Sequence, residues 1–470
     1  MSKPSTPDSP SPRLTYQQAL HRLLLLADGE RMAGIAPPLL KIDLARAAEF
    51  AERMGHPERS APVLHVAGTK GKGSVAAMSE SMLRHAGLRT MLFTSPHLIT
   101  FRERLRIDGQ PATEAEFAAS AERVWPHVEA MERESPEGRP TTFETMTIMA
   151  FDLARASRAD VQVIEVGMGG RLDSTNVADG RVAVITSLSM DHTAVLGDSI
   201  EKIAFEKAGI IKRGAMVVTA PQVPEAMAVV RAKAWEMGAR LVEAGRDVTW
   251  TAGRHDLTGQ AVTVRTPRRA YDLWLPLLGS HQQENAAVAV AAVEAMDMAV
   301  TPDSIVAGVR EVHWDGRFQV LGARPYVVVD GAHNPYSMGR LREAVREFIA
   351  PRRTVLLYGM SSDKDLAHMI AEIAPIADRV IACASRHPRA VPAARLREAF
   401  QQAGIAAEAA VDVPSALALA RSHAGEHDLV LATGSLFIVG EVLESWFGIP
   451  PEHYPELDPA SLTARPGTLP

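Results

Sequence analysis

A glycine-rich segment between a predicted strand and a predicted helix constrains the fold of this chain more than any other feature. The segment VLHVAGTKGKGS occupies residues 63–74. Its first five residues form an apolar run typical of a buried strand, and a helical pattern opens at Ser74. A glycine-rich turn lets the backbone approach an anion, and the helix N-terminus directs free N–H groups toward it. The segment therefore predicts a phosphate-binding loop.

The spacing of this loop departs from the common rule. In the usual loop a Ser or Thr follows the lysine directly, whereas here Gly73 separates Lys72 from Ser74. Lys72 can still reach the terminal phosphates of a nucleotide, and the Ser74 hydroxyl can hold Mg²⁺. A flexible glycine-rich turn without a ligand is the alternative, and the rest of the chain has to decide between the two.

Strand-like and helix-like segments alternate through most of the chain. This alternation predicts an α/β fold with a mostly parallel sheet, whose ligands bind at the carboxyl ends of the strands. Residues 247–277 show an alternating polar and apolar pattern, which predicts a small antiparallel patch. A second series predicts a Rossmann-like α/β domain. The expected strands are 63–67, 90–93, 161–166, 182–186, 216–219, 326–330, 354–358, 379–383 and 428–432, and the expected helices are 74–86, 143–157, 200–208, 224–237, 283–297, 303–311, 337–348, 365–374, 391–402 and 437–447.

The length of 470 residues exceeds what one hydrophobic core fills, so we expect more than one domain. We expect the boundary near His313, which gives domains at 13–313 and 314–452. The first twelve residues, MSKPSTPDSPSP, predict a disordered tail without the apolar core of a signal peptide, and residues 453–470 form a second tail.

Composition excludes several classes of protein. A net charge of −6 gives no general attraction to polyanions, which argues against a nucleic-acid partner. Cys383 is the only cysteine, so an internal disulfide and a cysteine-built zinc site are excluded, and a small buried residue is the expected role of this thiol. No segment approaches the ~18 uninterrupted apolar residues that cross a bilayer. We expect a cytoplasmic protein without a membrane partner.

Polar residues follow several of the predicted strands. Glu165 ends an otherwise apolar strand, where an unpaired carboxylate would be costly, so a cation is its expected partner. Asp191 and His192 follow the next strand; a hydrogen-bonded structural histidine is the alternative for His192 alone, whereas its combination with the loop serine and Glu165 favours a metal ligand. Lys207 precedes a glycine at a helix end, where a solvated lysine is the simpler interpretation.

The second half carries three further polar clusters: WDGRFQ at 314–319, DGAHNP at 330–335 and TGSL at 433–436. Each cluster alone could be a simple turn. Together, facing a phosphate-binding domain, they predict a small-molecule cleft between two domains.

The ordered set of these segments resembles one known family. GTKGKGS, EVGMGGRLDSTN, DHTAVLG, EKAGI, HQQENAAVA, GRF, DGAHNP and TGSL follow one another as in the folylpolyglutamate synthase/dihydrofolate synthase family of the Mur ligase superfamily. The resemblance extends from Leu14 to Pro450, and the family's loop has the same glycine between lysine and serine. It implies an N-terminal P-loop ATPase domain and a C-terminal glutamate ligase domain.

The resemblance implies a nucleotide and metal site. Loop residues would hold the ATP phosphates, with the serine also on one or two Mg²⁺ ions together with Glu165 and His192. Lys207 matches a position that is carbamylated in the family. Asn285 matches an adenine contact, and Arg317 and Asp330 match nucleotide contacts from the second domain. The loop residues concerned are Gly71, Lys72, Gly73 and Ser74.

The resemblance also implies where the other substrates bind. His333 and Ser435 fall in motifs that surround the incoming L-glutamate. The segment Thr94–Leu98 matches a mobile loop near the pterin, and three further positions match the lining of the dihydropteroate pocket. The implied pterin contacts are Ser95, Pro96, His97, Thr141, Phe143 and Asp173.

The implied reaction agrees with these residue types. A carboxylate is a poor acyl donor, so attack on the γ-phosphorus of ATP would convert it to an acyl phosphate, assisted by the charges of Lys72, Arg317 and Mg²⁺. The amine of L-glutamate then displaces phosphate. Lys72, Lys207, Asp330 and His333 form the expected catalytic set, and closure of the second domain would exclude water.

Two other functions remain open at this point. A peptidoglycan ligase that acts on a UDP-muramoyl precursor is the alternative within the superfamily, but TSPHL, TTFE and GGRLDSTN favour folate substrates. A P-loop phosphotransferase or nucleotide-gated binding module would have no evident use for the second domain. Among folate enzymes we favour one that accepts both dihydropteroate and tetrahydrofolates, with a monomer as the family-like default.

Overall fold

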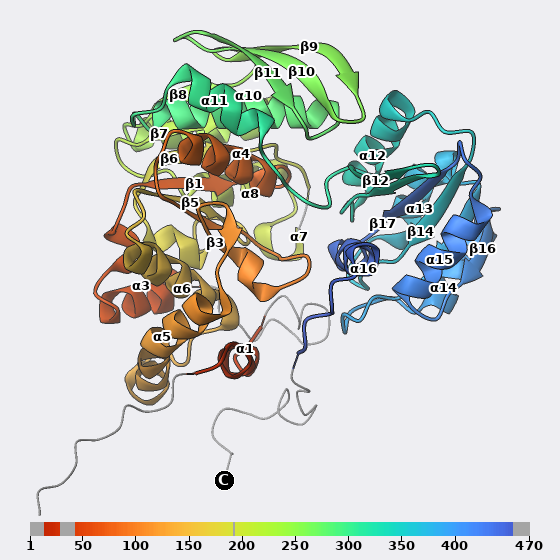
Figure 1. Ribbon diagram of the computed structural model, residues 1–470. Coiled ribbons are helices and arrows are strands. Elements are labelled where there is room, and N and C mark those ends of the chain that lie inside the picture. Colours follow the sequence, from red (N-terminus) through yellow and green to blue (C-terminus); the bar gives the residue numbers. More distant parts are fainter. Residues whose placement is uncertain (1–13, 29–42, 191–192, 455–470) are drawn as a thin grey trace, which may run out of the picture.

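The computed structural model describes residues 14–28, 43–190 and 193–454, without the side chains of residues 193 and 194. Two sheets organise the described chain into an N-terminal lobe, residues 14–310, and a C-terminal lobe, residues 319–447. Figure 1 shows the lobes side by side, with α16 (Leu436–Phe447) on the side of the C-terminal sheet that faces the N-terminal lobe.

The first sheet is mostly parallel, as the alternation predicts. β1 (Val63–Ala67) lies between β5 (Val161–Glu165) and β6 (Gly180–Ile185) and is fully buried, in keeping with its apolar sequence. In the described sheet only the pairings of β3 with its two neighbours, at one edge, are antiparallel. Within the described residues the order is β4 (Gln110–Pro111), β3 (Leu105–Ile107), β2 (Thr90–Phe93), β5, β1, β6, β7 (Met216–Thr219) and β8 (Arg240–Glu243).

Apolar side chains project from both faces of this sheet. Leu64 and Val66 point into one core, which is shared with α4 (Lys72–His85), α10 (Ser280–Ala295) and α11 (Pro302–Arg310). Met91 and Phe93 of β2 join a second core with the remaining N-terminal helices. The helices of this second core are α1 (Tyr16–Leu24), α3 (Leu44–Arg53), α5 (Glu114–Glu134) and α6 (Thr142–Ser157). Three other helices follow β6 and β7 in the chain: α7 (Thr193–Leu196), α8 (Ile200–Ala208) and α9 (Pro224–Glu236).

The predicted antiparallel patch is a separate sheet. It pairs β9 (Thr249–Asp256) with β10 (Gly259–Arg265) and β10 with β11 (Ala270–Leu275). Val262, Val264 and Leu273 of this sheet are buried in the same core as α10. The patch therefore covers the outer side of the helix that carries Asn285 (Figure 1).

The C-terminal lobe is a second α/β unit with an antiparallel strand at one edge. Apolar cores fill both faces of its sheet, as in a Rossmann-like fold. The sheet order is β12 (Gln319–Ala323), β13 (Tyr326–Val329), β17 (Leu429–Thr433), β14 (Thr354–Tyr358), β15 (Arg379–Ala382) and β16 (Ala406–Ala409), and the helices are α12 (Pro335–Phe348), α13 (Leu366–Ile373), α14 (Ala393–Gln402), α15 (Val413–His423) and α16.

The predicted fold class is confirmed, with differences at element ends. α4 starts at Lys72 and not at residue 74, because Gly71 serves as its N-cap in a left-handed conformation. The predicted domain boundary near His313 falls between α11 and β12. The structure adds elements that the sequence analysis did not predict: α1, α3, α5, α7, α15, β3, β4, β8, β12 and β16.

The chain after α16 returns to the N-terminal lobe. Glu452 accepts hydrogen bonds from the hydroxyls of Tyr16 and Thr100 and, over 2.9 Å, from the backbone N–H of Phe101. The predicted tail at 453–470 therefore has its first two residues in the described structure, and residues 455–470 lie outside it, as do residues 1–13. Among the described helices, none has both the length and the apolar character needed to cross a membrane.

Candidate active site

The predicted phosphate-binding loop connects β1 to α4 among the central strands of the first sheet. Gly71 has a φ of 87°, and in the described structure no side chain caps α4, so its first N–H groups are directed at the loop. A Cβ on Gly71 would lie 2.4 Å from Asn285 Oδ1, which leaves no room for a larger residue. The loop is therefore packed tightly against α10 and is not a loose surface turn, and its uncapped helix N-terminus fits the predicted anion site.

Lys72 and Glu165 face each other across the ends of β1 and β5. Lys72 Nζ lies 3.9 Å from Glu165 Oε1, and the Glu165 side chain is only 6% exposed. The other oxygen, Glu165 Oε2, accepts a 3.2 Å hydrogen bond from the backbone N–H of Ser95, in the loop after β2. The expectation that this buried carboxylate has a cationic partner is confirmed, and the partner is the loop lysine.

One predicted metal ligand, His192, lies outside the described residues. Among residues 14–28, 43–190 and 193–454 no group of three His, Cys, Asp or Glu side chains could hold a metal ion. Ser74 is buried in the first turn of α4, two residues after Lys72. A hydroxyl and a carboxylate are oxygen ligands of the kind that Mg²⁺ prefers, so this pair fits the ion.

Lys207 is buried near the end of α8, with an exposed fraction of 4%. The turn after β5 covers it: a Cβ on Gly170 would lie 3.1 Å from Lys207 Cα, and the backbone N–H of Arg171 donates to the Glu206 carbonyl over 2.7 Å. The simpler interpretation from the sequence, a solvated lysine at a helix end, is therefore wrong. It failed because the covering turn lies more than thirty residues earlier in the chain.

Phe143 and Asp173 border the same turn after β5. A Cβ on Gly167 would lie 2.4 Å from Phe143 Cζ, and Asp173 Oδ2 accepts a 2.9 Å hydrogen bond from the backbone N–H of Met168. Burial raises the pKa of Asp173, while the charge of Lys72 acts in the opposite direction. Thr141 caps α6, since its hydroxyl accepts a 3.2 Å hydrogen bond from the backbone N–H of Glu144. The structure thus brings Asp173 within electrostatic range of the loop lysine and places Phe143 against the same turn.

The predicted pterin loop, Ser95 to His97, is held by the N-terminal lobe and by the end of the described chain. His97 Nδ1 accepts a 3.0 Å hydrogen bond from Arg104 Nε, so Nε2 donates to the Tyr454 hydroxyl at 3.1 Å. Burial lowers the pKa of His97 well below its ordinary value, so the ring is neutral. Pro96 lies between these anchors and the Glu165 contact of Ser95. The histidine ring therefore fixes the loop against the end of the chain.

In the C-terminal lobe, Asp330 ties two of the predicted motifs together. Its Oδ2 accepts a hydrogen bond from Phe318 N–H and its Oδ1 one from Ala332 N–H, each 2.8 Å long. Burial raises the pKa of Asp330, and the nearby Arg317 guanidinium lowers it. The GRF turn and the DGAHNP loop are thereby held in one arrangement.

His333 and Ser435 follow β13 and β17, which are neighbouring parallel strands. His333 Nδ1 donates a 2.8 Å hydrogen bond to the Gly331 carbonyl, which orients the ring. Ser435 caps α16, since its hydroxyl accepts a 3.2 Å hydrogen bond from Phe437 N–H. The three predicted clusters of this lobe therefore meet at the carboxyl ends of its strands.

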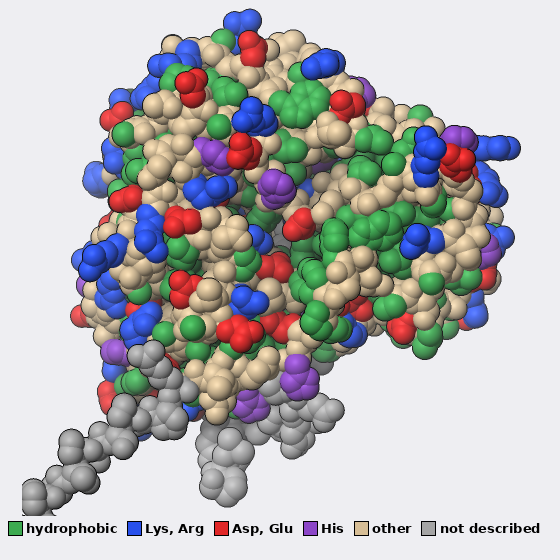
Figure 2. Space-filling view, in the orientation of Figure 1, with side chains coloured by type: hydrophobic (Ala, Val, Ile, Leu, Met, Phe, Trp, Pro, Cys, Tyr) green, Lys and Arg blue, Asp and Glu red, His purple; other side chains and the backbone are tan. Residues whose placement is uncertain are grey.

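The lobes meet at the loop ends of both sheets. A Cβ on Gly73 would lie 3.0 Å from the Trp314 ring, so the segment between the lobes lies against the phosphate-binding loop. His281, at the start of α10, is close enough to Arg340 and Arg317 that burial and these two charges lower its pKa to about 4. Figure 2 shows the surface hollowed between the two lobes, with acidic, basic and histidine side chains at its border.

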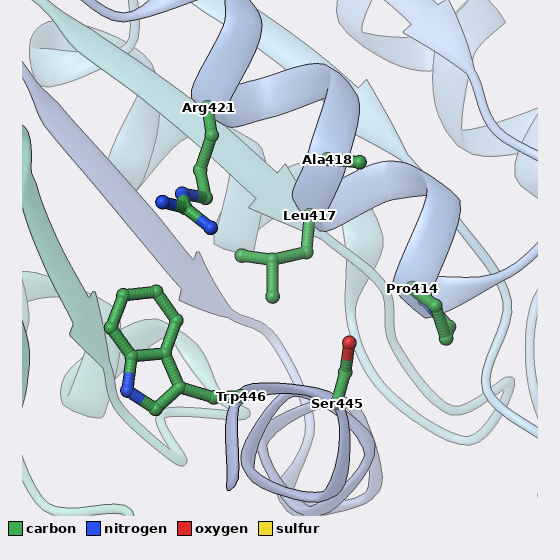
Figure 3. Close-up of a pocket in the computed structure, with 6 residues that line it drawn as sticks. All are labelled: Pro414, Leu417, Ala418, Arg421, Ser445 and Trp446. Carbon is green, nitrogen blue, oxygen red and sulfur yellow. The ribbon is translucent and has the colours of Figure 1, made fainter. Parts of the chain in front are cut away.

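A separate pocket of about 300 Å³ lies between α15 and α16. Figure 3 shows the Arg421 guanidinium facing the Trp446 ring across it, at 5.2 Å from the ring centroid. The pocket is lined by Pro414, Leu417, Ala418, Arg421, Ser445 and Trp446, so it includes none of the predicted site residues.

Four residues of the site region were not assigned a role from the sequence: Trp314, His65, Thr175 and Glu452. His65 is a polar residue inside an apolar strand, the same signal that led to Glu165, and it could have been found in that way. Glu452 gave no signal, because its partners Tyr16 and Thr100 are brought to it by the tertiary fold alone.

Comparisons with known proteins agree with this arrangement. Residues 66–293 match the Mur ligase middle domain, and residues 316–436 match the Mur ligase glutamate ligase domain. The dihydrofolate synthase/folylpolyglutamate synthase of Bacillus subtilis is 35% identical over 410 residues, which cover 86% of this chain and 94% of that protein.

A longer relative matches equally well over part of its length. A probable bifunctional folylpolyglutamate synthase/dihydropteroate synthase of Halobacterium salinarum is 40% identical over 402 residues, or 85% of this chain. The match covers 49% of that protein, so this chain spans about half the length of that relative.

Solved structures of relatives share the fold and contain nucleotides. Mycobacterium tuberculosis folylpolyglutamate synthase complexed with ADP superposes with a TM-score of 0.83 at 31% identity, over 92% of this chain and 99% of that one. E. coli FolC in complex with DHPP and ADP gives a TM-score of 0.81 at 30% identity, over 93% and 99%. The chain therefore belongs to the folylpolyglutamate synthase/dihydrofolate synthase family of ATP-dependent Mur ligases.

Proposed function

We propose that this protein joins L-glutamate to dihydropteroate, to the γ-carboxylate of tetrahydrofolate glutamates, or to both, at the expense of ATP. The observation that carries the proposal is the pairing of Lys72 with the buried Glu165 beside an uncapped helix N-terminus. This arrangement provides an ammonium for phosphates and a carboxylate for a cation within one site. Relatives that bind ADP and DHPP support the same assignment.

The N-terminal lobe would bind the nucleotide. The backbone of Gly71 and Gly73 and the ammonium of Lys72 would hold the phosphates, and Asn285, which lies against Gly71, would contact the base. Ser74, Glu165 and His192 would hold Mg²⁺, which supplies neutralisation of charge on the transferred phosphoryl group. From the other lobe, Arg317 would add a second positive charge, held in place by the Asp330 network.

The substrate carboxylate would then become an acyl phosphate by attack on the γ-phosphorus of ATP. Glutamate would bind near His333 and Ser435, with its amine directed at the activated carbonyl. With Nδ1 donating to the Gly331 carbonyl, His333 would accept the proton of that amine at Nε2. Trp314 and the Leu98 loop close the region between the lobes, which would keep water from the acyl phosphate.

We further propose that Lys207 is carbamylated. Burial of its side chain disfavours an ammonium group, and a carbamate would replace the positive charge by a carboxylate-like ligand. The intact mass of the protein in bicarbonate buffer, compared with that of Lys207→Met, would test for the added carbon dioxide.

The function is tested by ADP release with Mg-ATP and L-glutamate, with dihydropteroate, tetrahydrofolate or a UDP-muramoyl peptide as the acceptor. Release that depends on glutamate and on both pterins establishes the bifunctional enzyme, and release with tetrahydrofolate alone establishes a chain-extending synthase. Release with the muramoyl acceptor alone, or without glutamate, would refute the proposal. Light scattering of the same sample tests the predicted monomer, and the cytoplasmic location stays a prediction.

A further inference from the structure

A chain of buried hydrogen bonds runs from β1 to Asp173. His65 Nε2 lies 2.9 Å from Thr175 Oγ1, and Thr175 Oγ1 lies 2.5 Å from Asp173 Oδ1. His65 and Thr175 are 0% exposed and Asp173 is 6% exposed. The three side chains therefore form one polar path beneath the turn after β5, starting two residues before the end of the strand that leads into the phosphate-binding loop.

The direction of each hydrogen bond follows from the chemistry of the groups. The Asp173 carboxylate only accepts, so the Thr175 hydroxyl donates to it. The hydroxyl has a single proton, which it gives to Asp173. It therefore accepts the hydrogen bond from His65, and His65 Nε2 carries the hydrogen. His65 Nδ1 then bears the lone pair and has no hydrogen-bond partner among the described residues.

The surroundings of His65 favour this neutral form. Burial lowers its pKa to about 3, and the charge of Lys212 acts in the same direction. Lys212 itself is held nearby, since its Nζ donates a 2.8 Å hydrogen bond to the Asn176 carbonyl. The imidazole is thus a fixed donor and does not exchange protons at working pH.

The path fixes one oxygen of Asp173 and leaves a defined role for the other. Oδ1 accepts from both the Thr175 hydroxyl and, over 3.0 Å, the Thr175 backbone N–H. Oδ2 accepts from the Met168 backbone N–H and keeps a further lone pair. A carboxylate oriented in this way can accept N–H donors of a fused heteroaromatic ring, as a pterin presents.

We propose that His65 and Thr175 are positioning residues that orient the Asp173 carboxylate toward the pterin ring of the acceptor substrate. The inference rests on the proposed function, in which Asp173 lines the pterin pocket. Neither His65 nor Thr175 touches the substrate; they act through Asp173. Their contribution is specific to the pterin and does not extend to ATP or glutamate.

The test compares two substitutions at one position. Thr175→Val keeps the shape but removes the hydroxyl, and Thr175→Ser keeps the hydroxyl. We expect Thr175→Val to raise the KM for dihydropteroate about tenfold, with kcat and the KM values for ATP and glutamate unchanged, and Thr175→Ser to restore the wild-type KM. A matched control is Thr145→Val, since the Thr145 hydroxyl is also buried and has no partner among the described residues.

Asp173→Asn separates failure of this inference from failure of the proposed function. If Asp173→Asn raises the pterin KM but Thr175→Val does not, the positioning role is overturned and the pocket assignment stands. If Asp173→Asn leaves the pterin KM unchanged, the positioning role and the assignment of Asp173 to the pterin pocket are both overturned.

The histidine itself provides a second readout that needs no substitution at Thr175. In ¹⁵N spectra of the whole chain labelled at histidine, with His65 assigned by its loss in His65→Gln, we expect a neutral ring protonated at Nε2 at pH 5.5. A ring protonated at Nδ1, or a doubly protonated ring at that pH, would overturn the inference even if the Thr175 variants failed to fold.

Discussion

The contact between Leu98 and Gly440 joins the lobes beside the candidate site, and it can be tested by adding one methyl group. Gly440 lies inside α16, and a Cβ at this position would lie 2.2 Å from the Leu98 carbonyl oxygen. Ordinary contacts begin at 3.4 Å, so Gly440→Ala requires a displacement of roughly 1.2 Å. Leu98 cannot yield freely, because its N–H and that of Ile99 donate to the Glu103 carboxylate at 2.9 and 3.0 Å.

The methyl group should therefore move α16, and the C-terminal lobe with it, away from the N-terminal lobe. Misplacement of reacting groups by about 1 Å can cost on the order of 10²-fold in rate, so we expect kcat for glutamate-dependent ADP release to fall by about that factor. Stability should change little, since alanine gains about 1 kcal/mol over glycine in a helix, which offsets part of the strain. Steady-state kinetics and thermal unfolding measure the two effects.

Gly339→Ala is the matched control. Gly339 also lies inside a helix, α12, and its added Cβ would approach the flexible end of Glu372 at 3.2 Å and no backbone atom. We expect this variant to keep wild-type kcat. If Gly440→Ala keeps kcat within twofold as well, the contact between Leu98 and α16 is not part of the catalytic arrangement, and the reasoning is refuted.

Three further predictions concern the loop and the strand before it. Lys72→Ala should fold normally, and its rate of ligation should fall on the order of 10³-fold. Wild-type turnover in that variant would refute the assignment of Lys72 to the ATP phosphates. Gly71→Ala should cost about 1–3 kcal/mol through the left-handed conformation and weaken ADP binding measured by calorimetry, because its Cβ would displace Asn285. His65 has a pKa of about 3 in the folded protein against 6.5 in the unfolded chain, so the unfolded state binds more protons and this residue removes about 2 kcal/mol of stability between pH 8 and pH 5. Denaturant unfolding of His65→Gln should lack that loss, and equal pH slopes for both proteins would contradict the neutral buried ring.

The predictable part of the fold is where local pattern and tertiary context agree. β1, β5 and β6 are central strands with apolar sequences, and they lie where the sequence places them. β16 reads AAEA, which has little strand propensity, and it forms because β15 offers a parallel edge. The helix α1 was not predicted although Tyr16, Leu20 and Leu23 recur at helical spacing, because the apolar run at residues 23–26 overlaps its end and obscures the amphipathic period.

The candidate site shows the same division. Glu165 was found because a carboxylate in an apolar strand demands a partner, and the structure provides Lys72. The burial of Lys207 could not be read from its own helix, since the covering turn comes from another part of the chain. The contacts of Glu452 could not be predicted for the same reason, because the three groups that it binds belong to segments more than 350 residues away.

The pairing of Lys72 with Glu165 explains how one site can hold opposite charges before its substrates arrive. A buried carboxylate without a partner is costly, and so is a lysine pointed at an empty anion site, so each charge stabilises the other in place. At 3.9 Å the pair is an ion contact longer than a hydrogen bond, which makes it cheaper to separate. Phosphates would attract the ammonium while a magnesium ion attracts the carboxylate, so both charges can exchange partners without leaving the site. Because α4 starts at Lys72 itself, the ammonium is carried on the first residue of the helix and lies beside the carboxylate at the end of β5.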